Sequence, residues 1–247
     1  MYLICCPNIY AQSIIDDLAN VHISGIELPL MNIEDNNQNL QFLDKEINNF
    51  DYIIFPSGTA IEYAKEAIIK ASTPQFITVG DASAAKLNKL TGQRIIYPEN
   101  ISGGIALFNE KLSKLNLMQK KVLVIKGCGG NTKLYAKLIK TGVNFMSIDI
   151  YKRVLQTVEP DHLKKMLLIQ GLQGIIITSS GLAEWLFNQG LRAKCLHLLK
   201  NQLFVTIHPQ IKHKLIKLGA NKVLVTQNAK KSAVAELIKK LELVVVH

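Results

Sequence analysis

The sequence feature that most restricts the fold is an internal duplication whose parts occur in rotated order. The matched positions are Ile53 with Ile175, Phe76 with Phe204, and Leu123 with Leu3. In the first two matches the earlier copy lies in the middle of the chain, whereas in the third match it lies at the N-terminus. Two similar five-stranded units, the second inserted after the second strand of the first, explain this order. Coincidence between two Rossmann-like units is the alternative, but the constant offset across Leu3–Leu30 argues against it.

Short apolar runs rich in β-branched residues alternate with amphipathic segments. The predicted strands are Tyr2–Cys6, Ile23–Leu30, Tyr52–Phe55, Phe76–Val79, Arg94–Tyr97, Lys121–Ile125, Val143–Ile150, Gly174–Ile177, Leu203–Ile207 and Lys222–Val225. The predicted helices are Ala60–Lys70, Ala82–Leu90, Ile105–Leu115, Lys133–Lys140, Asp161–Ile169, Leu182–Asn188, Ile211–Leu218 and Ser232–Leu241. Glycine tolerates the left-handed conformation that often ends a helix, so helix ends are predicted at Gly92, Gly142, Gly190 and Gly219.

Strand–helix alternation of this length predicts parallel sheets with right-handed crossovers. The expected fold is α/β, with two doubly wound, flavodoxin-like domains, one inserted in the other and joined by a two-stranded linker. The first domain is predicted at residues 1–33 and 157–247, and the inserted domain at residues 38–147. The linkers are expected at about 30–37 and 148–156.

Composition narrows the function classes. Apolar residues make up 48% of the chain, but no apolar run reaches the roughly 18–20 residues of a membrane span. The short Met1–Cys6 segment has no basic flank and no cleavage site, so we expect a strand there and not a signal peptide. The 4 cysteines fit no zinc-binding spacing. We therefore expect reduced thiols and a cytoplasmic protein.

The net charge of +10 is consistent with nucleic acid, phosphate esters or polycarboxylates as ligands. A lysine-rich surface that only improves solubility is an equally simple explanation. Because arginine is scarce beside lysine, sequence-specific reading of DNA is disfavoured.

Ligands of open parallel sheets bind beyond the carboxyl ends of the strands, where helix N-termini gather. The predicted strands end in small, polar loops, and glycine and serine let backbone amides approach an anion closely. Each loop by itself could be a tight turn with an N-cap. A whole set of such loops instead favours a site that binds an acidic ligand. Asp81 is the only acid expected near them, as a helix cap, and no metal, dinucleotide or nucleophile motif occurs.

Four motifs then occur in a fixed order. They are a strand-Ser-x-x-Ala turn at Ile53–Ala60, a Val-Gly run at Val79–Gly92, a Ser-x-Gly turn at Pro98–Leu107, and Lys121–Gly130 followed by Ile150–Arg153. In this order they make nearly the whole chain resemble the uroporphyrinogen-III synthase family. The resemblance implies two α/β domains, one inserted in the other.

The resemblance also implies a reaction. Hydroxymethylbilane, a linear tetrapyrrole with carboxylate arms, loses its terminal hydroxyl to give an azafulvene and closes through a spiro intermediate with ring D inverted. The reaction needs no metal or cofactor. We expect a monomer that acts on this small-molecule substrate in the cleft between its domains, with no nucleic acid or membrane as partner.

Family positions and strand-end loops together give the candidate site. By resemblance Tyr151 assists departure of the hydroxyl, although it could instead be an aromatic that fills the linker. The candidate substrate-binding residues are Ser57, Gly58, Gly80, Ser83, Ser102, Gly103, Lys126, Gly127, Gly129, Thr178, Ser179, Ser180 and His208. His208 has a structural explanation as well, since a lone histidine in such a loop usually has a structural role.

The chain departs from the family pattern at Cys6 and Asn131, where relatives carry arginine, and at His208, where glycine is common. Weaker carboxylate binding is expected unless Lys126 or Lys152 compensates. Two other functions remain open at this point. One is a non-catalytic, degenerate two-domain module that binds an acidic small molecule, and the other is a basic protein associated with nucleic acid.

Overall fold

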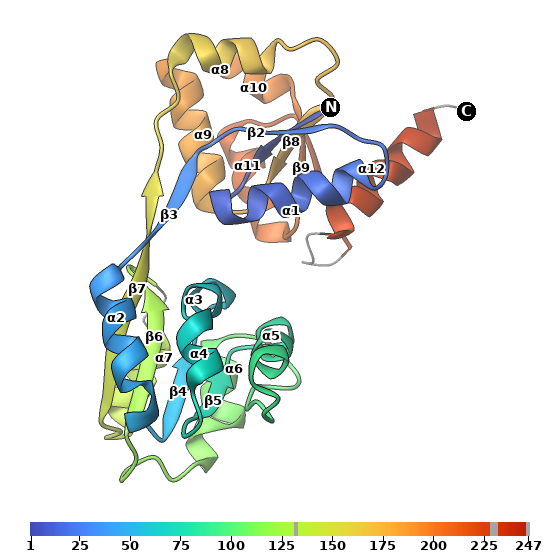
Figure 1. The fold of residues 1–247 in the computed structure, drawn as a ribbon. Coiled ribbons are helices and arrows are strands. Elements are labelled where there is room, and N and C mark those ends of the chain that lie inside the picture. Colours follow the sequence, from blue (N-terminus) through green and yellow to red (C-terminus); the bar gives the residue numbers. More distant parts are fainter. Residues whose placement is uncertain (131–132, 228–231, 246–247) are drawn as a thin grey trace. The chain divides into compact units, whose positions relative to one another are not determined.

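The computed structural model describes residues 1–130, 133–227 and 232–245. The fold is α/β and contains two sheets, as predicted. The chain divides into two compact units (Figure 1). Unit 1 comprises Met1–Ile33 and Val154–His247, and unit 2 comprises Glu34–Arg153. Both divisions fall within the segments that were expected to be linkers.

Unit 1 is built on a 5-stranded sheet with the strand order β10-β9-β8-β1-β2. All four pairings in it are parallel. Its strands are β1 (Tyr2–Cys5), β2 (Gly25–Glu27), β8 (Gly174–Ile177), β9 (Leu203–Thr206) and β10 (Lys222–Val225). Its helices are α1 (Asn8–Ala19), α8 (Pro160–Leu167), α9 (Ser180–Arg192), α10 (Leu196–Asn201), α11 (Pro209–Leu218) and α12 (Ser232–Val245).

Successive side chains of a strand point to opposite faces, so the sheet of unit 1 has a core on each face. Leu3 and Phe204 pack on one face with residues of α8, α9, α10 and α11. Ile4 and Val205 pack on the other face with residues of α1 and α12. This sandwich leaves the carboxyl ends of the strands as the place where loops enter helices.

Unit 2 is built on a second 5-stranded sheet with the order β3-β7-β6-β4-β5. Its strands are β3 (Met31–Asp35), β4 (Tyr52–Phe55), β5 (Gln75–Thr78), β6 (Val122–Gly127) and β7 (Phe145–Leu155). Its helices are α2 (Asn37–Glu46), α3 (Gly58–Tyr63), α4 (Lys65–Lys70), α5 (Asp81–Thr91), α6 (Gly104–Glu110) and α7 (Lys133–Lys140), with short 3₁₀ turns at Ile47–Asn49 and Leu112–Lys114.

Two backbone hydrogen bonds define the direction of β3 against β7. Asn36 N–H donates to the Ile150 carbonyl at 2.9 Å, and Gln156 N–H donates to the Leu30 carbonyl at 2.9 Å. The partner on β7 moves backward as the chain moves forward along β3, so this pair is antiparallel. It corresponds to the predicted two-stranded linker.

Three strand pairings occur in both sheets in the same register. Leu3 is paired with Ile175 and with Ile26, and Ile175 with Phe204. In unit 2 the matched pairs are Leu123 with Ile53, Leu123 with Met146, and Ile53 with Phe76. The rotated duplication is therefore confirmed, because residues aligned by sequence occupy equivalent ladder positions.

Proline explains two predicted strands that differ in the structure. The predicted strand Ile23–Leu30 is shorter, β2 ending at Glu27, and a separate strand, β3, begins at Met31. Pro29 has no N–H to continue the ladder. The predicted strand Arg94–Tyr97 is reduced to a single bridge between Ile77 and Ile96, and Pro98 follows closely.

Three of the four predicted helix-ending glycines are confirmed and one is wrong. Gly92 and Gly219 are left-handed C-caps of α5 and α11, and Gly142 has a φ of +72° just after α7. Gly190 instead lies inside α9. A β-carbon at this position would lie 2.3 Å from Leu199 Cδ1 of α10, so close packing against α10 accounts for the glycine. Helices α1, α2 and α10 are not among the predicted helices.

Candidate active site

The loops that follow β4 and β5 in unit 2 meet at the carboxyl edge of the sheet. Ser57 is the N-cap of α3, and its Oγ accepts a hydrogen bond from Ala60 N–H at 3.2 Å. A β-carbon at Gly58 would lie 3.5 Å from Ser83 Oγ in the first turn of α5. Three of the candidate residues therefore lie close together, as the rule for parallel sheets predicts.

A second contact joins the loop after β5 to the turn before α6. A β-carbon at Gly80 would lie 2.5 Å from Ser102 Oγ, so this approach needs glycine. Gly103 N–H donates to the Val79 carbonyl at 2.7 Å, and Gly103 has a φ of +131° that favours glycine. Gly80, Ser102 and Gly103 thus form one compact turn cluster at the same edge.

Tyr151 lies on β7, paired with Gly127 at the carboxyl end of β6, and is only 2% exposed. Its ring stacks on Tyr63 with 5.7 Å between centroids. A β-carbon at Gly127 would lie 2.3 Å from Tyr151 Cζ, so the absence of a side chain there makes room for the ring. The Tyr151 hydroxyl lies 3.1 Å from Ser57 Oγ, and Arg153 donates to it from a guanidinium nitrogen at 3.1 Å.

Arg153 was missing from the sequence-based set of site residues. Its guanidinium carbon lies 5.3 Å from the centre of the Tyr151 ring, within the range of a cation–π contact. The neighbouring Lys152 forms an exposed ion pair with Glu34 at 3.0 Å. The signal for Arg153 was its position two residues after Tyr151, since residues i and i+2 of a strand share a face.

Lys126 also lies at the end of β6, but its ammonium forms an ion pair with Asp149. The same nitrogen lies 5.8 Å from the centre of the Tyr135 ring. Burial, and then the negative charge of Asp149, raise the pKa of Tyr135 to about 12. Gly129 has a φ of +68° in the following loop, and Asn131 lies outside the described residues. Lys126 therefore already has a carboxylate partner within unit 2.

In unit 1 the loop after β8 closes on α9. Ser179 is the N-cap of α9, its Oγ accepting from Leu182 N–H at 3.1 Å. Ser180 is the first residue of the helix. Thr178 N–H donates to the Cys5 carbonyl at 3.3 Å, which ties this loop to the end of β1. Ser179 thus repeats the capping role of Ser57 in unit 2.

The loop after β9 uses histidine as its cap. His208 Nδ1 accepts a hydrogen bond from Gln210 N–H at 3.2 Å, and His208 is the N-cap of α11. This bond occupies one ring nitrogen and supports the structural explanation for His208. Cys6, which follows β1, is buried at 0% exposure.

Two acids near these edges differ from expectation. Asp81 is not a cap: Gly80 holds the N-cap position of α5 and Asp81 is the first helical residue. Glu27 on β2 of unit 1 was not predicted. Burial raises the pKa of Glu27. Its Oε1 atom is buried without a hydrogen-bond partner among the described residues.

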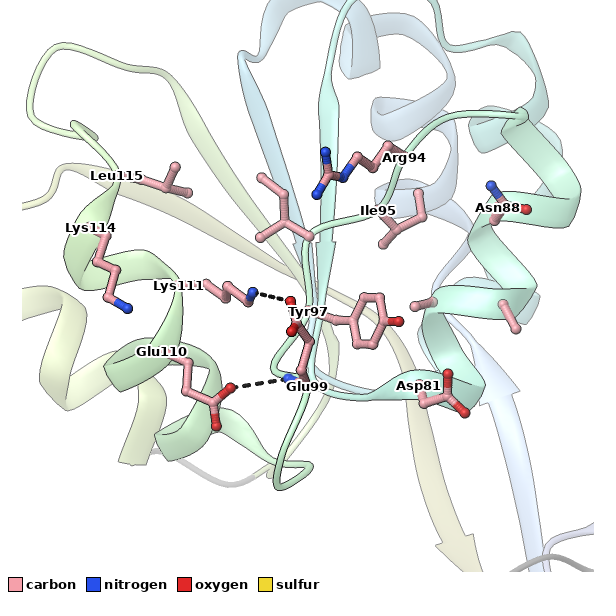
Figure 2. Close-up of a pocket in the computed structure, with 13 residues that line it drawn as sticks. Asp81, Asn88, Arg94, Ile95, Tyr97, Glu99, Glu110, Lys111, Lys114 and Leu115 are labelled. Atoms are coloured by element: carbon pink, nitrogen blue, oxygen red, sulfur yellow. Dashed lines mark hydrogen bonds and ion pairs between the residues drawn. The ribbon is translucent and has the colours of Figure 1, made fainter.

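Two of the cavities in unit 2 are lined in part by residues of α6. One of about 620 Å³ is lined by turn residues that include Ser102, Gly103 and Gly104. Figure 2 shows the other, of about 700 Å³, between α5 and the segment that ends at Leu115. There Glu99 is bonded to the end of α6, as its carboxylate accepts from Lys111 at 2.6 Å and its N–H donates to the Glu110 carboxylate at 3.1 Å. The smaller cavity is the one that adjoins the candidate site.

Within the described residues, no group of three or more His, Cys, Asp or Glu side chains could hold a metal ion. The helices of the described part also include none with the length and apolar character to cross a membrane.

Comparison with models of protein families gives a match that covers most of the chain. The family model described as "Uroporphyrinogen-III synthase HemD" matches residues 13–236. The chain belongs to the uroporphyrinogen-III synthase family. Members of this family are cyclising lyases of tetrapyrrole and heme biosynthesis, and this chain is accordingly such an enzyme with a tetrapyrrole substrate. A comparison with curated protein sequences found no match.

Solved structures of uroporphyrinogen-III synthases share the fold. A mutant of the enzyme from the extreme thermophile Thermus thermophilus has a TM-score of 0.58 at 12% identity, with 98% of each chain covered. The enzyme from Helicobacter pylori has a TM-score of 0.57 at 17% identity, with 87% of this chain and 92% of that chain covered. At these identities the likeness concerns the two-domain uroporphyrinogen-III synthase fold alone.

Proposed function

We propose that the protein closes hydroxymethylbilane to uroporphyrinogen III with inversion of ring D, in a cleft between unit 1 and unit 2. One observation supports this beyond the family role: in each sheet a strand is followed by a serine that caps the next helix, Ser57 before α3 and Ser179 before α9. Free N–H groups and the positive end of the helix dipole favour carboxylates at such places. A substrate with a carboxylate on every ring arm suits loops of this kind on both units.

The candidate substrate-binding residues of both units remain part of this proposal. In unit 2, the three loops at Ser57, Gly80 and Ser102 form one cluster. Gly58 closely approaches Ser83, and Gly80 closely approaches Ser102. In unit 1, Ser179 and His208 cap two helices of at least ten residues each. We propose that backbone amides at these five positions hold carboxylate arms and orient the chain.

Catalysis would come mainly from restricting the conformation of the substrate. Loss of the terminal hydroxyl gives an azafulvene, which is reactive without help from the protein. The uncatalysed chain closes without inversion. Holding the reacting rings in one arrangement can supply several kcal/mol of the barrier, so a site with few titratable groups is sufficient for this chemistry.

For Tyr151 the family resemblance suggests assistance to the departing hydroxyl. Because its ring is buried, the Tyr151 hydroxyl would act through the groups that it contacts, which are Ser57 and Arg153. Substituting Tyr151→Phe removes the hydroxyl and keeps the packing of the ring. We expect kcat/KM for isomer III to fall roughly three- to tenfold, the equivalent of one hydrogen bond. The far-ultraviolet circular dichroism spectrum should be unchanged, and a loss of folded signal would contradict this explanation.

The decisive experiment is an isomer assay. The protein is incubated with hydroxymethylbilane, the products are oxidised, and isomers I and III are separated by chromatography. Isomer III above the level of a heat-inactivated control is expected. Isomer I alone would refute the proposed function and leave a binding module for an acidic small molecule.

We also propose that one chain is sufficient for activity, since both units come from the same polypeptide. Sedimentation velocity at assay concentration should give a monomer. A stable dimer under these conditions would contradict this part of the proposal.

A further inference from the structure

The Tyr151 ring is held too firmly to move independently. Its exposure is 2%, Tyr63 stacks on it at 5.7 Å, and Gly127 leaves no space between the ring and β6. The hydroxyl is already occupied by two partners, Ser57 and Arg153, at 3.1 Å each. A group in this position is better suited to fixing another side chain than to meeting a substrate itself.

Arg153 is the side chain that Tyr151 fixes. Both residues lie on the same face of β7, two positions apart. Arg153 is bound at its guanidinium by the hydroxyl and packs over the ring at 5.3 Å, yet the residue itself is exposed. Its remaining N–H donors can therefore reach a partner in solution.

Arg153 also differs from its cationic neighbours in its ion pairing. Lys126 is paired with Asp149, and Lys152 is paired with Glu34. None of the ion pairs among the described residues includes Arg153. A guanidinium held in place and not neutralised by a carboxylate is a prepared site for one.

The pairing of β6 with β7 shows where Arg153 lies in the sheet. Gly127, the last residue of β6, is paired with Tyr151. Arg153 lies two residues further along β7, beyond the carboxyl end of β6 and beside the loop that starts at Cys128. Cys128 N–H donates to the Tyr151 carbonyl at 2.8 Å, which fixes the loop to the same strand. Arg153 therefore stands at the edge where ligands of parallel sheets bind.

We propose that Arg153 binds a carboxylate of the tetrapyrrole substrate and that Tyr151 is the positioning residue that holds Arg153 for this purpose. The inference rests on the proposed function, because that function supplies the polycarboxylate. It assigns Tyr151 to substrate binding and not to proton transfer, and this difference can be measured.

The test is a double-mutant cycle on steady-state kinetics with hydroxymethylbilane, with isomer III as the measured product. Arg153→Ala should raise KM about tenfold, as expected for loss of one charge-assisted hydrogen-bond pair, and leave kcat within about twofold. Tyr151→Phe should raise KM about fivefold. The double variant should have the KM of Arg153→Ala alone, because the inference predicts that the hydroxyl affects KM through Arg153.

Lys120→Gln is the control, since it removes one exposed positive charge of unit 2 just before β6, at the end of the sheet opposite the candidate loops. We expect its KM to stay within about twofold of the wild type. Arg153→Lys should give an intermediate KM, because an ammonium lacks the planar fork that serves two partners. Thermal unfolding of each variant, with a transition like that of the wild type, excludes a folding defect.

Three outcomes would overturn the inference. The first is a fall in kcat at unchanged KM, which would assign the pair to the chemical step. The second is additive effects in the double variant, and the third is an equal rise of KM in Lys120→Gln. Wild-type protein that forms only isomer I would instead refute the proposed function and, with it, any substrate role for Arg153.

Discussion

Gly127 has a structural role that the sequence did not predict. Its place after a strand predicted a glycine that lets backbone amides approach an anion. In the structure its missing side chain makes room for the Tyr151 ring, 2.3 Å from where a β-carbon would be. The two residues lie on neighbouring strands that are far apart in sequence, so the contact needs the folded sheet. At the residue scale, a glycine's position was predictable and its partner was not.

Glu27 provides a pH-dependent prediction at the same scale. Burial raises the pKa of Glu27 above its ordinary value of 4.5, so the folded protein binds its proton more tightly than the unfolded chain. The contribution of Glu27 to stability is therefore fully present below pH 4.5 and is lost as pH rises through the raised pKa.

Substituting Glu27→Gln removes this titration and keeps the size of the side chain. The variant should be more stable than the wild type at about pH 8, and the difference should shrink toward about pH 4. Urea unfolding at a series of pH values measures it. A difference that stays constant with pH, or that grows in acid, would contradict the assignment.

At the element scale, α9 combines predictable and unpredictable features. Ser179 begins the helix with a side-chain cap, as a serine after a strand suggests. The helix then continues through Gly190, because α10 packs so closely that Leu199 fills the space beside this glycine. Trp185, which lies between Ser179 and Gly190, donates from its indole N–H to the Gln156 carbonyl at 2.7 Å. The helix therefore extends past the glycine that locally favours a helix end, because packing against α10 stabilises the longer helix.

Two glycines of α9 form a matched pair that tests this packing. Gly190→Ala should destabilise the protein by roughly 1–3 kcal/mol, the usual cost of overpacking, since its β-carbon meets Leu199 at 2.3 Å. Gly181→Ala has no atom within 4 Å and should be neutral or stabilising by up to about 1 kcal/mol. Chemical denaturation measures both. Equal effects of the two substitutions would show that helix propensity, not packing against α10, governs this position.

At the scale of the whole molecule, each unit has a core of its own. The helices α1 and α8–α12 cover both faces of the unit 1 sheet. In unit 2, Leu107, Leu112 and Leu138 pack with Ile54 and Val124 on one face of the second sheet. Unit 2 is also a single continuous stretch of chain. Separate cores predict that each unit can fold as a domain of its own.

A polypeptide of residues 34–153 should therefore fold without unit 1. We expect a circular dichroism spectrum with helix and strand signals and a cooperative thermal transition. Its stability should be below that of the intact protein, since β3 begins at Met31 and β7 ends at Leu155, both outside the segment. A spectrum without a cooperative transition would indicate that unit 2 depends on unit 1.

By itself, the sequence determined most of the strands, three of the four helix ends marked by glycine, the duplication and the inserted arrangement. These features depend on local signals, such as apolar alternation, capping serines and glycines, and on a register that repeats between two copies. The match of Leu3 with Leu123 correctly gave equivalent ladder positions in both sheets.

Only the tertiary structure decided what surrounds each site residue. It paired Lys126 with Asp149, buried Tyr151 against Gly127, and left Arg153 as a cation outside the described ion pairs. These relations join residues from different strands, and no local pattern encodes which distant side chain will occupy a given space. Close packing selects the partners, and with them the charges that remain for a ligand.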